Sequence, residues 1–276
     1  MPDVAGHPEI YFRQVGDYDL AIRDAGAGEG LPLVLIHGFG GSINSWFLTQ
    51  NALAAGRRVI AFDLPGHGSS CLHVGEGTLR AFASIVSHML TEMELPRVHL
   101  MGHSLGGGIA LSLAKLRPDQ AASLSLIAPA ALGAEVNAEF LYNFIEADDP
   151  AAMRLVLEKL VAAKILIGRK AVEDVLSNHN VAGVREALHH IVNACFDGSR
   201  QRQILRSVFT MTDIPAQVIW GVEDAILPAS HGQGLSPRVT VHFLEGAGHM
   251  PQLEKAAEVN ALIRSFLMRA EAEAGL

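Results

Sequence analysis

The chain has 276 residues, of which 49% are hydrophobic and 18% are charged, and its formal net charge is −8. This composition can bury a large core and excludes intrinsic disorder. No apolar run approaches the roughly 18–20 residues that span a bilayer, and the N-terminus lacks the pattern of a secretory signal. Without a Lys/Arg block, binding to nucleic acid is not expected either. We therefore expect a cytoplasmic protein that binds neither membranes nor nucleic acid.

Short apolar runs closed by Gly or Pro predict buried strands, and in the first half of the chain they alternate with runs of helical period. This alternation favours an α/β fold with a mainly parallel sheet covered on both faces. In the N-terminal segments 10–16 and 18–26, apolar and polar residues alternate more clearly than in these runs, which predicts an antiparallel hairpin at one sheet edge. The predicted buried strands are residues 32–38, 58–66, 97–104, 123–129, 216–221 and 239–246.

Helical spacing of apolar residues is clear at 78–93 and again at 259–267. Between residues 133 and 212 no strand is expected; Asp149-Pro150 predicts a helix start there. An all-helical block between two strand signals predicts a cap inserted into the sheet domain. The expected organisation is therefore a core of 1–132 and 213–276, interrupted by a helical cap of 133–212.

The segment Gly102-His103-Ser104-Leu105-Gly106 fits the pattern G-x-S-x-G. It follows a predicted strand directly and precedes a predicted helix, and this context makes the short pattern informative. A sharp strand-to-helix turn projects the serine above the sheet, and the helix N-terminus favours developing negative charge there. The alternative is a glycine-rich helix start with a capping serine. We predict that Ser104 is a nucleophile.

A serine hydroxyl needs a base to take its proton. Of the 13 histidines, only His249 lies in a Gly-rich loop after the last predicted strand. Asp224 follows the strand before it and is the expected acid that orients the imidazole; the adjacent Glu223 is the second candidate. His103, next to the serine, has no assigned chemistry and is interpreted as structural.

The expected oxyanion hole consists of two backbone N–H groups, from Leu105 after the nucleophile and from Phe39 in the loop His37-Gly38-Phe39-Gly40-Gly41. His37 is expected to hold this loop rather than to react.

Apolar residues of the cap are expected to line a substrate pocket, with Phe39, Tyr142 and Phe144 as the substrate-binding candidates. The two cysteines, Cys71 and Cys195, form neither a disulfide framework nor a metal cluster. We expect no metal and no cofactor.

Five motifs in order, HGFGG at 37–41, DLPGHGSS at 63–70, GHSLGG at 102–107, WGVED at 220–224 and GAGH at 246–249, resemble the α/β-hydrolase fold superfamily. The resemblance implies an eight-stranded, mostly parallel sheet with helices on both faces and a helical cap after the sixth strand. It also implies that Ser104 is the nucleophile, Asp224 the acid and His249 the base, with Phe39 and Leu105 as oxyanion donors.

Within the superfamily, the stretches HGFGGSINSW, SLIAPAALGAEVN and GAGHMPQLEKAAEVN are similar to the hydrolase-like domain of the acetoin dehydrogenase E2-type dihydrolipoamide acetyltransferases. The chain departs from that family because it has no DKA-type lipoylated lysine and no HxxxDG motif, and it starts almost at the hydrolase domain. Acyl transfer is therefore only weakly implied. A histidine before the serine also differs from the asparagine usual in carbon–carbon bond hydrolases.

Three functions remain open. The first is a serine hydrolase that cleaves a carboxylic ester or thioester of a small acyl substrate through an acyl-enzyme. The second is an acyltransferase of the acetoin type, which uses the same triad and passes the acyl group to a thiol. The third is a non-catalytic binder, against which the intact triad counts. The expected partner is a small-molecule acyl substrate, and a homo-oligomer is left open.

Overall fold

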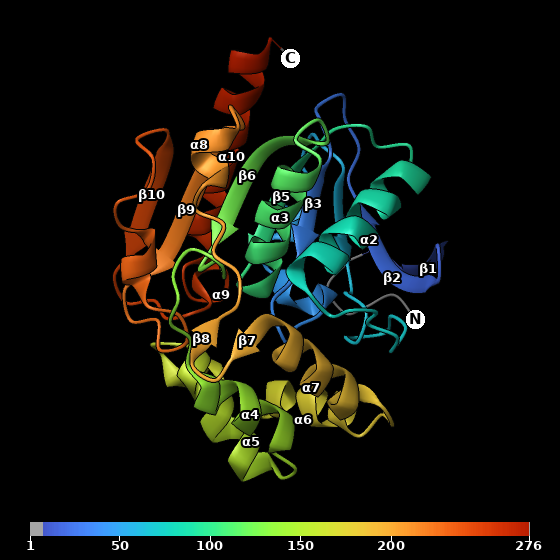
Figure 1. Ribbon diagram of the computed structural model, residues 1–276, viewed down its shortest axis with the longest axis vertical. Coiled ribbons are helices and arrows are strands. Elements are labelled where there is room, and N and C mark those ends of the chain that lie inside the picture. Colours follow the sequence, from blue (N-terminus) through green and yellow to red (C-terminus); the bar gives the residue numbers. More distant parts are fainter. Residues whose placement is uncertain (1–7, 276) are drawn as a thin grey trace.

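The structure is a computed structural model that describes residues 8–275. Within these residues, eight strands form one sheet in the order β1-β2-β4-β3-β5-β6-β9-β10 (Figure 1). The strands are β1 (Ile10–Val15), β2 (Tyr18–Ala25), β3 (Leu33–Ile36), β4 (Val59–Phe62), β5 (Val98–His103), β6 (Ala121–Ile127), β9 (Ala216–Gly221) and β10 (Val239–Leu244).

Only β2 runs against its neighbours, pairing antiparallel with β1 and with β4, and all other pairs are parallel. The predicted parallel sheet and the edge hairpin are thus confirmed. The central strands β3, β4, β5, β6 and β9 are buried at every residue, because helices cover both faces. This explains why they are continuous apolar runs, whereas β1 at the edge leaves Phe12 58% exposed.

Two hydrophobic clusters lie on opposite faces of the sheet, since alternate residues of each strand enter different clusters. Val34 and Ile36 of β3 pack with α2 (Leu79–Glu92) and α3 (Leu105–Leu116), whereas Leu33 and Leu35 pack with α10 (Ala256–Ala274). The shorter helical elements of the core are η1 (Ile43–Trp46), α1 (Gln50–Leu53), η4 (Ala229–Gly232) and α9 (Pro251–Glu254). None of the helices in residues 8–275 has the length and apolarity needed to cross a bilayer.

The chain between β6 and β9 is mainly helical, and its helices α4 to α7 lie below the sheet in Figure 1; we call this part the cap segment, or cap. Asp149 caps the second cap helix by accepting hydrogen bonds from the N–H groups of Ala151 and Ala152, with Pro150 in the first turn, as the sequence predicts. The cap elements are α4 (Ala138–Glu146), α5 (Pro150–Leu157), η2 (Glu158–Leu160), η3 (Lys164–Leu166), α6 (Arg169–His179), α7 (Val184–Cys195), β7 (Phe196–Asp197) and β8 (Arg200–Gln201). Helix α8 (Val208–Met211) lies instead at the other end of the view in Figure 1, where it contacts α3 of the core.

The expectation that this block contains no strand is wrong for four residues. Strands β7 and β8 pair as a small antiparallel hairpin around Gly198, whose φ is +54°. Two residues per strand are too few to produce an alternating pattern in the sequence. The hairpin places Gln201 so that its side chain accepts a hydrogen bond from Ala131 N–H and donates to Gly133 C=O. It thereby ties the end of the cap to its beginning.

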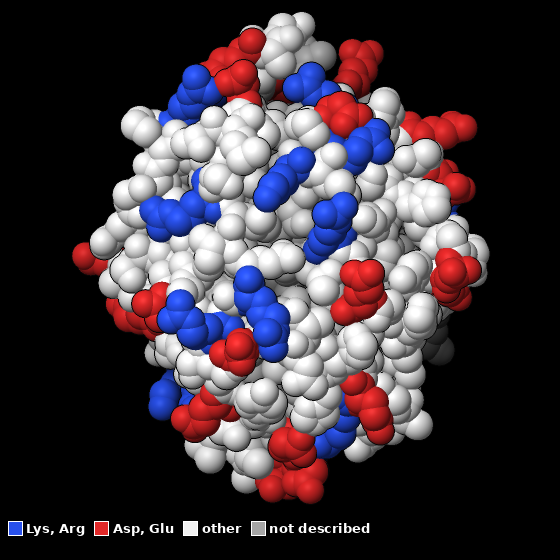
Figure 2. Space-filling view, viewed as in Figure 1, with Lys and Arg blue, Asp and Glu red and all other residues white. Residues whose placement is uncertain are grey.

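Charged side chains of both signs share the face of the molecule in Figure 2, which is the face seen in Figure 1. Lys and Arg are spread over its middle, and Asp and Glu lie mainly toward its rim. This face therefore carries charges of both signs, although the chain carries a net charge of −8.

Candidate active site

Ser104 lies at the sharp turn between β5 and α3, with φ +52° and ψ −116°. Its N–H donates to Ile127 C=O, and its C=O accepts from Gly107 N–H, so neighbouring strands and the helix hold the turn. A Cβ at Gly106 would lie 2.1 Å from Ile36 O, and one at Gly102 would lie 2.3 Å from Gly106 O. The two glycines are therefore required by close packing. A serine at positive φ costs about 1–3 kcal/mol, which is typical of functional turns.

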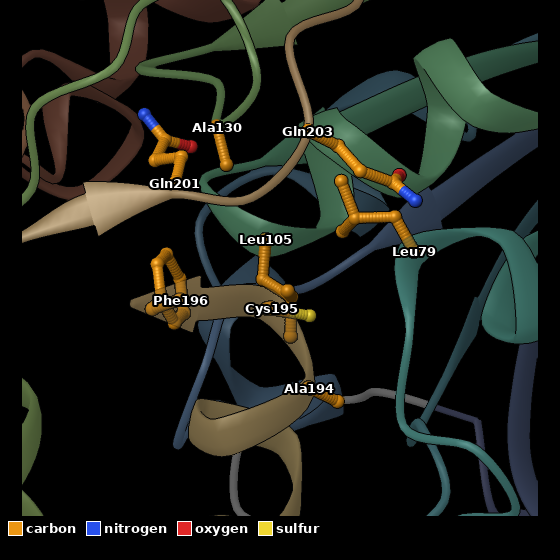
Figure 3. Close-up of a pocket in the computed structure, with 8 residues that line it drawn as sticks. All are labelled: Leu79, Leu105, Ala130, Ala194, Cys195, Phe196, Gln201 and Gln203. Atoms are coloured by element: carbon orange, nitrogen blue, oxygen red, sulfur yellow. The ribbon is translucent and has the colours of Figure 1, made fainter. Parts of the chain in front are cut away.

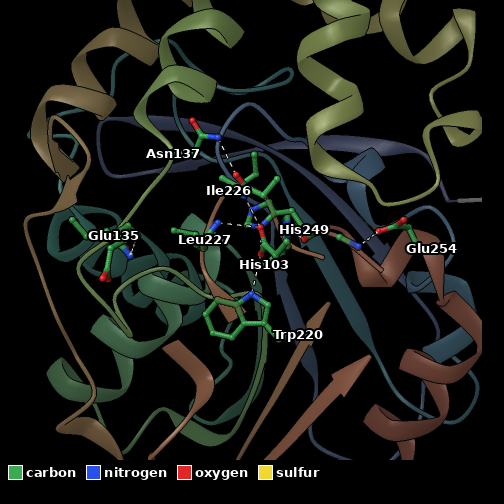
Figure 4. A network of polar contacts seen from close by, with 12 residues as sticks. His103, Glu135, Asn137, Trp220, Ile226, Leu227, His249 and Glu254 are labelled. Carbon is green, nitrogen blue, oxygen red and sulfur yellow. Dashed lines mark hydrogen bonds and ion pairs between the residues drawn. The ribbon is translucent and has the colours of Figure 1, made fainter. Parts of the chain in front are cut away.

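Asp224 and His249 are joined by a hydrogen bond of 2.7 Å between His249 Nδ1 and Asp224 Oδ2. The other oxygen of Asp224 accepts from the N–H groups of Ile226 and Leu227, and Oδ2 also accepts from Trp220 Nε1 (Figure 4). Burial alone would raise the pKa of Asp224, but His249 and these hydrogen bonds outweigh it and lower that pKa. Asp224 is therefore a buried carboxylate, and His249 Nδ1 donates to it, which leaves Nε2 as the basic nitrogen.

Glu223, the second candidate for the acid, makes different contacts. Its carboxylate accepts hydrogen bonds from Gly246 N–H (3.0 Å) and Ala247 N–H (3.1 Å). The structure therefore places it against the backbone of the loop before His249 and places Asp224 against the imidazole.

The loop 37–41 passes directly over the serine turn. A Cβ at Gly38 would lie 3.1 Å from Ser104 Cβ, so a side chain there would collide with the turn. His37 holds the loop as expected, since its Nε2 accepts from Leu64 N–H while Nδ1 donates to Gly38 C=O. Burial, with a smaller effect of the nearby His67, lowers the pKa of His37 well below its usual value. His37 is thus neutral.

A cavity of about 850 Å³ lies between this loop, the serine turn and the cap. The structure brings Ser104, His249, Phe39 and Leu105 to its wall together. Whether the N–H groups of Phe39 and Leu105 act as oxyanion donors remains a prediction.

Among residues 8–275, no three His, Cys, Asp or Glu side chains lie close enough together to hold a metal ion.

The two cap candidates differ. Phe144 lines the cavity, and its ring centroid lies 5.8 Å from that of Phe39. Tyr142 is 41% exposed and does not line the cavity. Helix α4 buries Phe140, Leu141, Phe144 and Ile145, and a helix turns by about 100° per residue, so Tyr142 points away from this face. The structure therefore does not bring Tyr142 to the site.

A second, much smaller hollow of about 10 Å³ lies behind Leu105, with room for about one water molecule (Figure 3). Cys195 borders it, and its thiol donates to Gly77 C=O. Burial raises the pKa of this thiol to about 12. Cys195 is thus held as a neutral thiol, and its environment gives it no nucleophilic character.

Two contacts to the His249 loop were not assigned from the sequence. His103 Nε2 lies 2.8 Å from His249 O and donates to it, and the two rings lie 4.8 Å apart. The side chain of Glu254 accepts a hydrogen bond of 2.6 Å from Gly248 N–H. The position of His103 next to Ser104 was a signal for its role, since β5 places it beside the loop. Glu254 binds backbone groups only, which leave no mark in the sequence.

Several buried imidazoles predict that the folded state loses stability as the pH falls. Burial lowers the pKa of His67 from 6.5 to about 4, and burial together with His249 lowers that of His103 to about 3. Groups with a depressed pKa in the folded state contribute stability above the unfolded pKa and lose it as the pH falls. Each of these two histidines should therefore lower the free energy of unfolding at pH 5 by on the order of 2 kcal/mol relative to neutral pH.

Asp63 acts in the opposite direction, because burial raises its pKa from 3.8 to about 6 and its protonation favours the folded state on acidification. Protonation of Asp63 therefore offsets roughly 1 kcal/mol of the stability that the histidines lose at pH 5. The free energy of unfolding should still fall by a few kcal/mol between pH 7 and pH 5, as measured by denaturant titrations. An unchanged midpoint over this range would contradict neutral burial of His67 and His103.

Comparison with known proteins places the chain in a family. Residues 33–262 match the family model described as "Alpha/beta hydrolase family". The chain belongs to the α/β hydrolase family. It is 42% identical over 267 residues to the "Dihydrolipoyllysine-residue acetyltransferase component of acetoin cleaving system" of Pseudomonas putida, covering 97% of this chain and 71% of the relative.

Other members of the α/β hydrolase family are similar over most of their length. The chain is 31% identical to the "2-hydroxymuconate semialdehyde hydrolase" of Pseudomonas sp. (strain CF600), over 92% of each chain. A solved meta-cleavage product hydrolase from Pseudomonas fluorescens IP01 superposes with a TM-score of 0.83 at 24% identity, over 94% of this chain and 98% of that one. At this identity the superposition shows the fold alone.

Proposed function

We propose that the chain is a serine hydrolase that cleaves a carboxylic ester or thioester of a small acyl substrate. The observation that carries the proposal is the buried Asp224–His249 pair, whose His249 lines the same cavity as the strained Ser104 turn. A buried carboxylate that accepts from Nδ1 leaves Nε2 free to take a proton, and this is the arrangement that activates a serine hydroxyl.

The reaction follows from this arrangement. Ser104 Oγ attacks the carbonyl carbon while His249 Nε2 takes its proton, and the oxyanion is stabilised by the N–H groups of Phe39 and Leu105. His249 then gives the proton to the leaving alcohol or thiol, which departs and leaves an acyl-enzyme. Water attacks the acyl-enzyme with His249 again acting as base, and the carboxylic acid is released.

A fluorophosphonate probe tests the proposal, because it reacts with an activated serine and not with an ordinary one. Mass spectrometry of the labelled protein should find one adduct, on Ser104. A label on another residue, or none after prolonged incubation, would contradict an acyl-enzyme on Ser104 and favour a non-catalytic binder.

A second candidate, acyl transfer to a thiol, is favoured by the 42% identity to a protein named as an acetyltransferase component. The two reactions share the acyl-enzyme and differ in what attacks it. With an acyl-thioester and increasing dihydrolipoamide or coenzyme A, hydrolysis predicts that free acid remains the main product. A main product of acylated thiol would instead assign the chain to the acyltransferases.

We further propose that residues 133–212 form a lid that selects the acyl group. Phe144 of α4 supports this, since it lines the cavity and packs against the oxyanion loop, where a Cβ at Gly40 would lie 2.2 Å from its ring. A lid at this position excludes water and shapes the acyl pocket.

Shortening Phe144 should therefore change the acyl preference. In Phe144→Leu, kcat/KM for longer acyl p-nitrophenyl esters should rise relative to the acetate by about tenfold, the scale of one or two methylene groups in a pocket. Tyr142→Ala is the matched control, because Tyr142 belongs to the same helix and points away from the cavity. If neither variant moves the preference, the cap is a packing element and not a lid that selects the acyl group.

A further inference from the structure

Glu254 joins two segments that are far apart in the sequence. Its Oε2 accepts from Gly248 N–H (2.6 Å), and its Oε1 accepts from Ala162 N–H (2.7 Å) and Ala163 N–H (3.1 Å). Gly248 directly precedes His249, whereas Ala162 and Ala163 belong to the cap between η2 and η3. One carboxylate at the end of α9 therefore holds the loop of the proposed base and the cap together; Figure 4 shows Glu254 beside the polar network around His249.

The two backbones that Glu254 joins are in close contact. A Cβ at Gly248 would lie 2.9 Å from Ala162 N and 3.0 Å from Val161 C, so only glycine fits there with the cap in place. The carboxylate therefore satisfies three N–H donors at a contact where a side chain on Gly248 would push the cap away. The two segments are therefore linked by the carboxylate of Glu254 in addition to their direct packing.

Gly248 is adjacent to the residue that must be placed most accurately. On one side, His249 is held by Asp224 through Nδ1 and by His103 through its carbonyl oxygen. These contacts come from the core and do not depend on the cap. The hydrogen bond from Gly248 to Glu254 is the polar contact that links this loop to the cap, because the same carboxylate accepts from Ala162 and Ala163.

We propose that Glu254 is a positioning residue that couples docking of the cap to the placement of His249. With the cap docked, Ala162 and Ala163 fix one oxygen of Glu254, and the other oxygen fixes Gly248. With the cap displaced, the carboxylate is released toward solvent, and the His249 loop loses one of its anchors. The catalytic consequence rests on the function proposed above, whereas the coupling of the two segments does not.

Two variants interrupt this link from opposite sides. Glu254→Gln keeps the size of the side chain, but an amide has one acceptor oxygen, so its NH₂ group must face N–H donors of either the loop or the cap. Ala162→Pro removes one donor from the cap, but its ring also lies close to Gly248, since a Cβ at Gly248 would lie 2.9 Å from Ala162 N. Glu254→Gln adds no bulk at this contact and therefore separates loss of the link from a steric effect. Val161 has φ −131° and ψ +146°, a conformation that a residue before proline favours.

The first readout is hydrogen exchange, which does not depend on any activity. Ala162→Pro should accelerate exchange of the Gly248 amide about tenfold or more, although Gly248 is not altered. Glu254→Gln should accelerate exchange on both sides of the link. Glu223→Gln is the matched control, because Glu223 binds the same loop through Gly246 N–H and Ala247 N–H and not through the cap. It should leave exchange at Ala162 and Ala163 unchanged.

The second readout is kinetic. Each variant should lower kcat for an ester by about 10- to 100-fold with KM changed less than threefold, since the cavity remains intact and the base is displaced. The double variant should be no slower than the slower single variant, because both act through one link. Faster exchange confined to the mutated side, or additive losses of activity, would overturn the coupling. If the unmodified protein neither turns over esters nor reacts with a fluorophosphonate, the proposed function fails, and exchange at Gly248 still decides the coupling.

Discussion

Replacing Ser104 with alanine should lower kcat for an activated ester by roughly 10⁵- to 10⁶-fold, the loss typical of removing a nucleophile from a serine hydrolase. The loss is large because no other group of the triad can form the acyl-enzyme. Protein stability should change little, since the turn at φ +52° is held by backbone hydrogen bonds that alanine keeps.

Turnover of p-nitrophenyl acetate and thermal unfolding of the same samples measure both effects. Ser112→Ala is a suitable control, because Ser112 lies on the same helix α3 and does not line the cavity; it should retain activity. A Ser104→Ala variant that keeps a tenth of the activity at unchanged stability would show that another side chain, or a water molecule, attacks the substrate directly.

The part of the site that could be predicted from the sequence is the part where packing restricts the residue type. At Gly102 and Gly106 any side chain would overlap neighbouring backbone atoms, so the glycines around Ser104 mark the turn directly. Likewise, strands buried on both faces must be continuously apolar, and for this reason the mainly parallel sheet could be predicted.

The parts that were missed depend on orientation or on backbone partners. Helical periodicity places Phe144 and Tyr142 on one helix, but it does not tell which face of the helix meets the cavity and the loop 37–41; of these two residues, only Phe144 does. The hairpin β7–β8 is too short to have a period. Glu254 binds N–H groups that every residue except proline carries, and one of its partners is 92 residues away.

The choice between Asp224 and Glu223 as the acid is tested by the second large expected effect. Asp224→Asn should lower kcat by roughly 10³- to 10⁴-fold, as the corresponding change does in other serine hydrolases. The reason lies in the contacts of the carboxylate. One oxygen accepts from Ile226 and Leu227, and the other accepts from His249 and Trp220, so all of its neighbours are donors.

An amide at position 224 can satisfy only one of these sides. If its oxygen keeps the two backbone N–H groups, its NH₂ group faces His249 Nδ1, which must then be an acceptor, and the proton moves to Nε2. The imidazole is then in the tautomer that cannot accept a proton from Ser104. If the amide is reversed, its NH₂ group lies against two N–H donors, and a buried polar clash of this kind costs about 1–3 kcal/mol of stability.

Kinetics and denaturant unfolding of Asp224→Asn separate these two cases. The first leaves one donor, Trp220 Nε1, without its acceptor and removes the basic Nε2, whereas the second leaves two backbone N–H groups without their acceptor and keeps the tautomer, so it costs more stability and less activity. Glu223→Gln is the matched control one residue away; its amide oxygen still accepts one of the two N–H groups of the loop, so kcat should stay within about threefold of the unmodified protein. A loss of activity that is larger in Glu223→Gln than in Asp224→Asn would move the acid by one residue. It would also require that the hydrogen bond of 2.7 Å between Asp224 and His249 serves only to hold the loop.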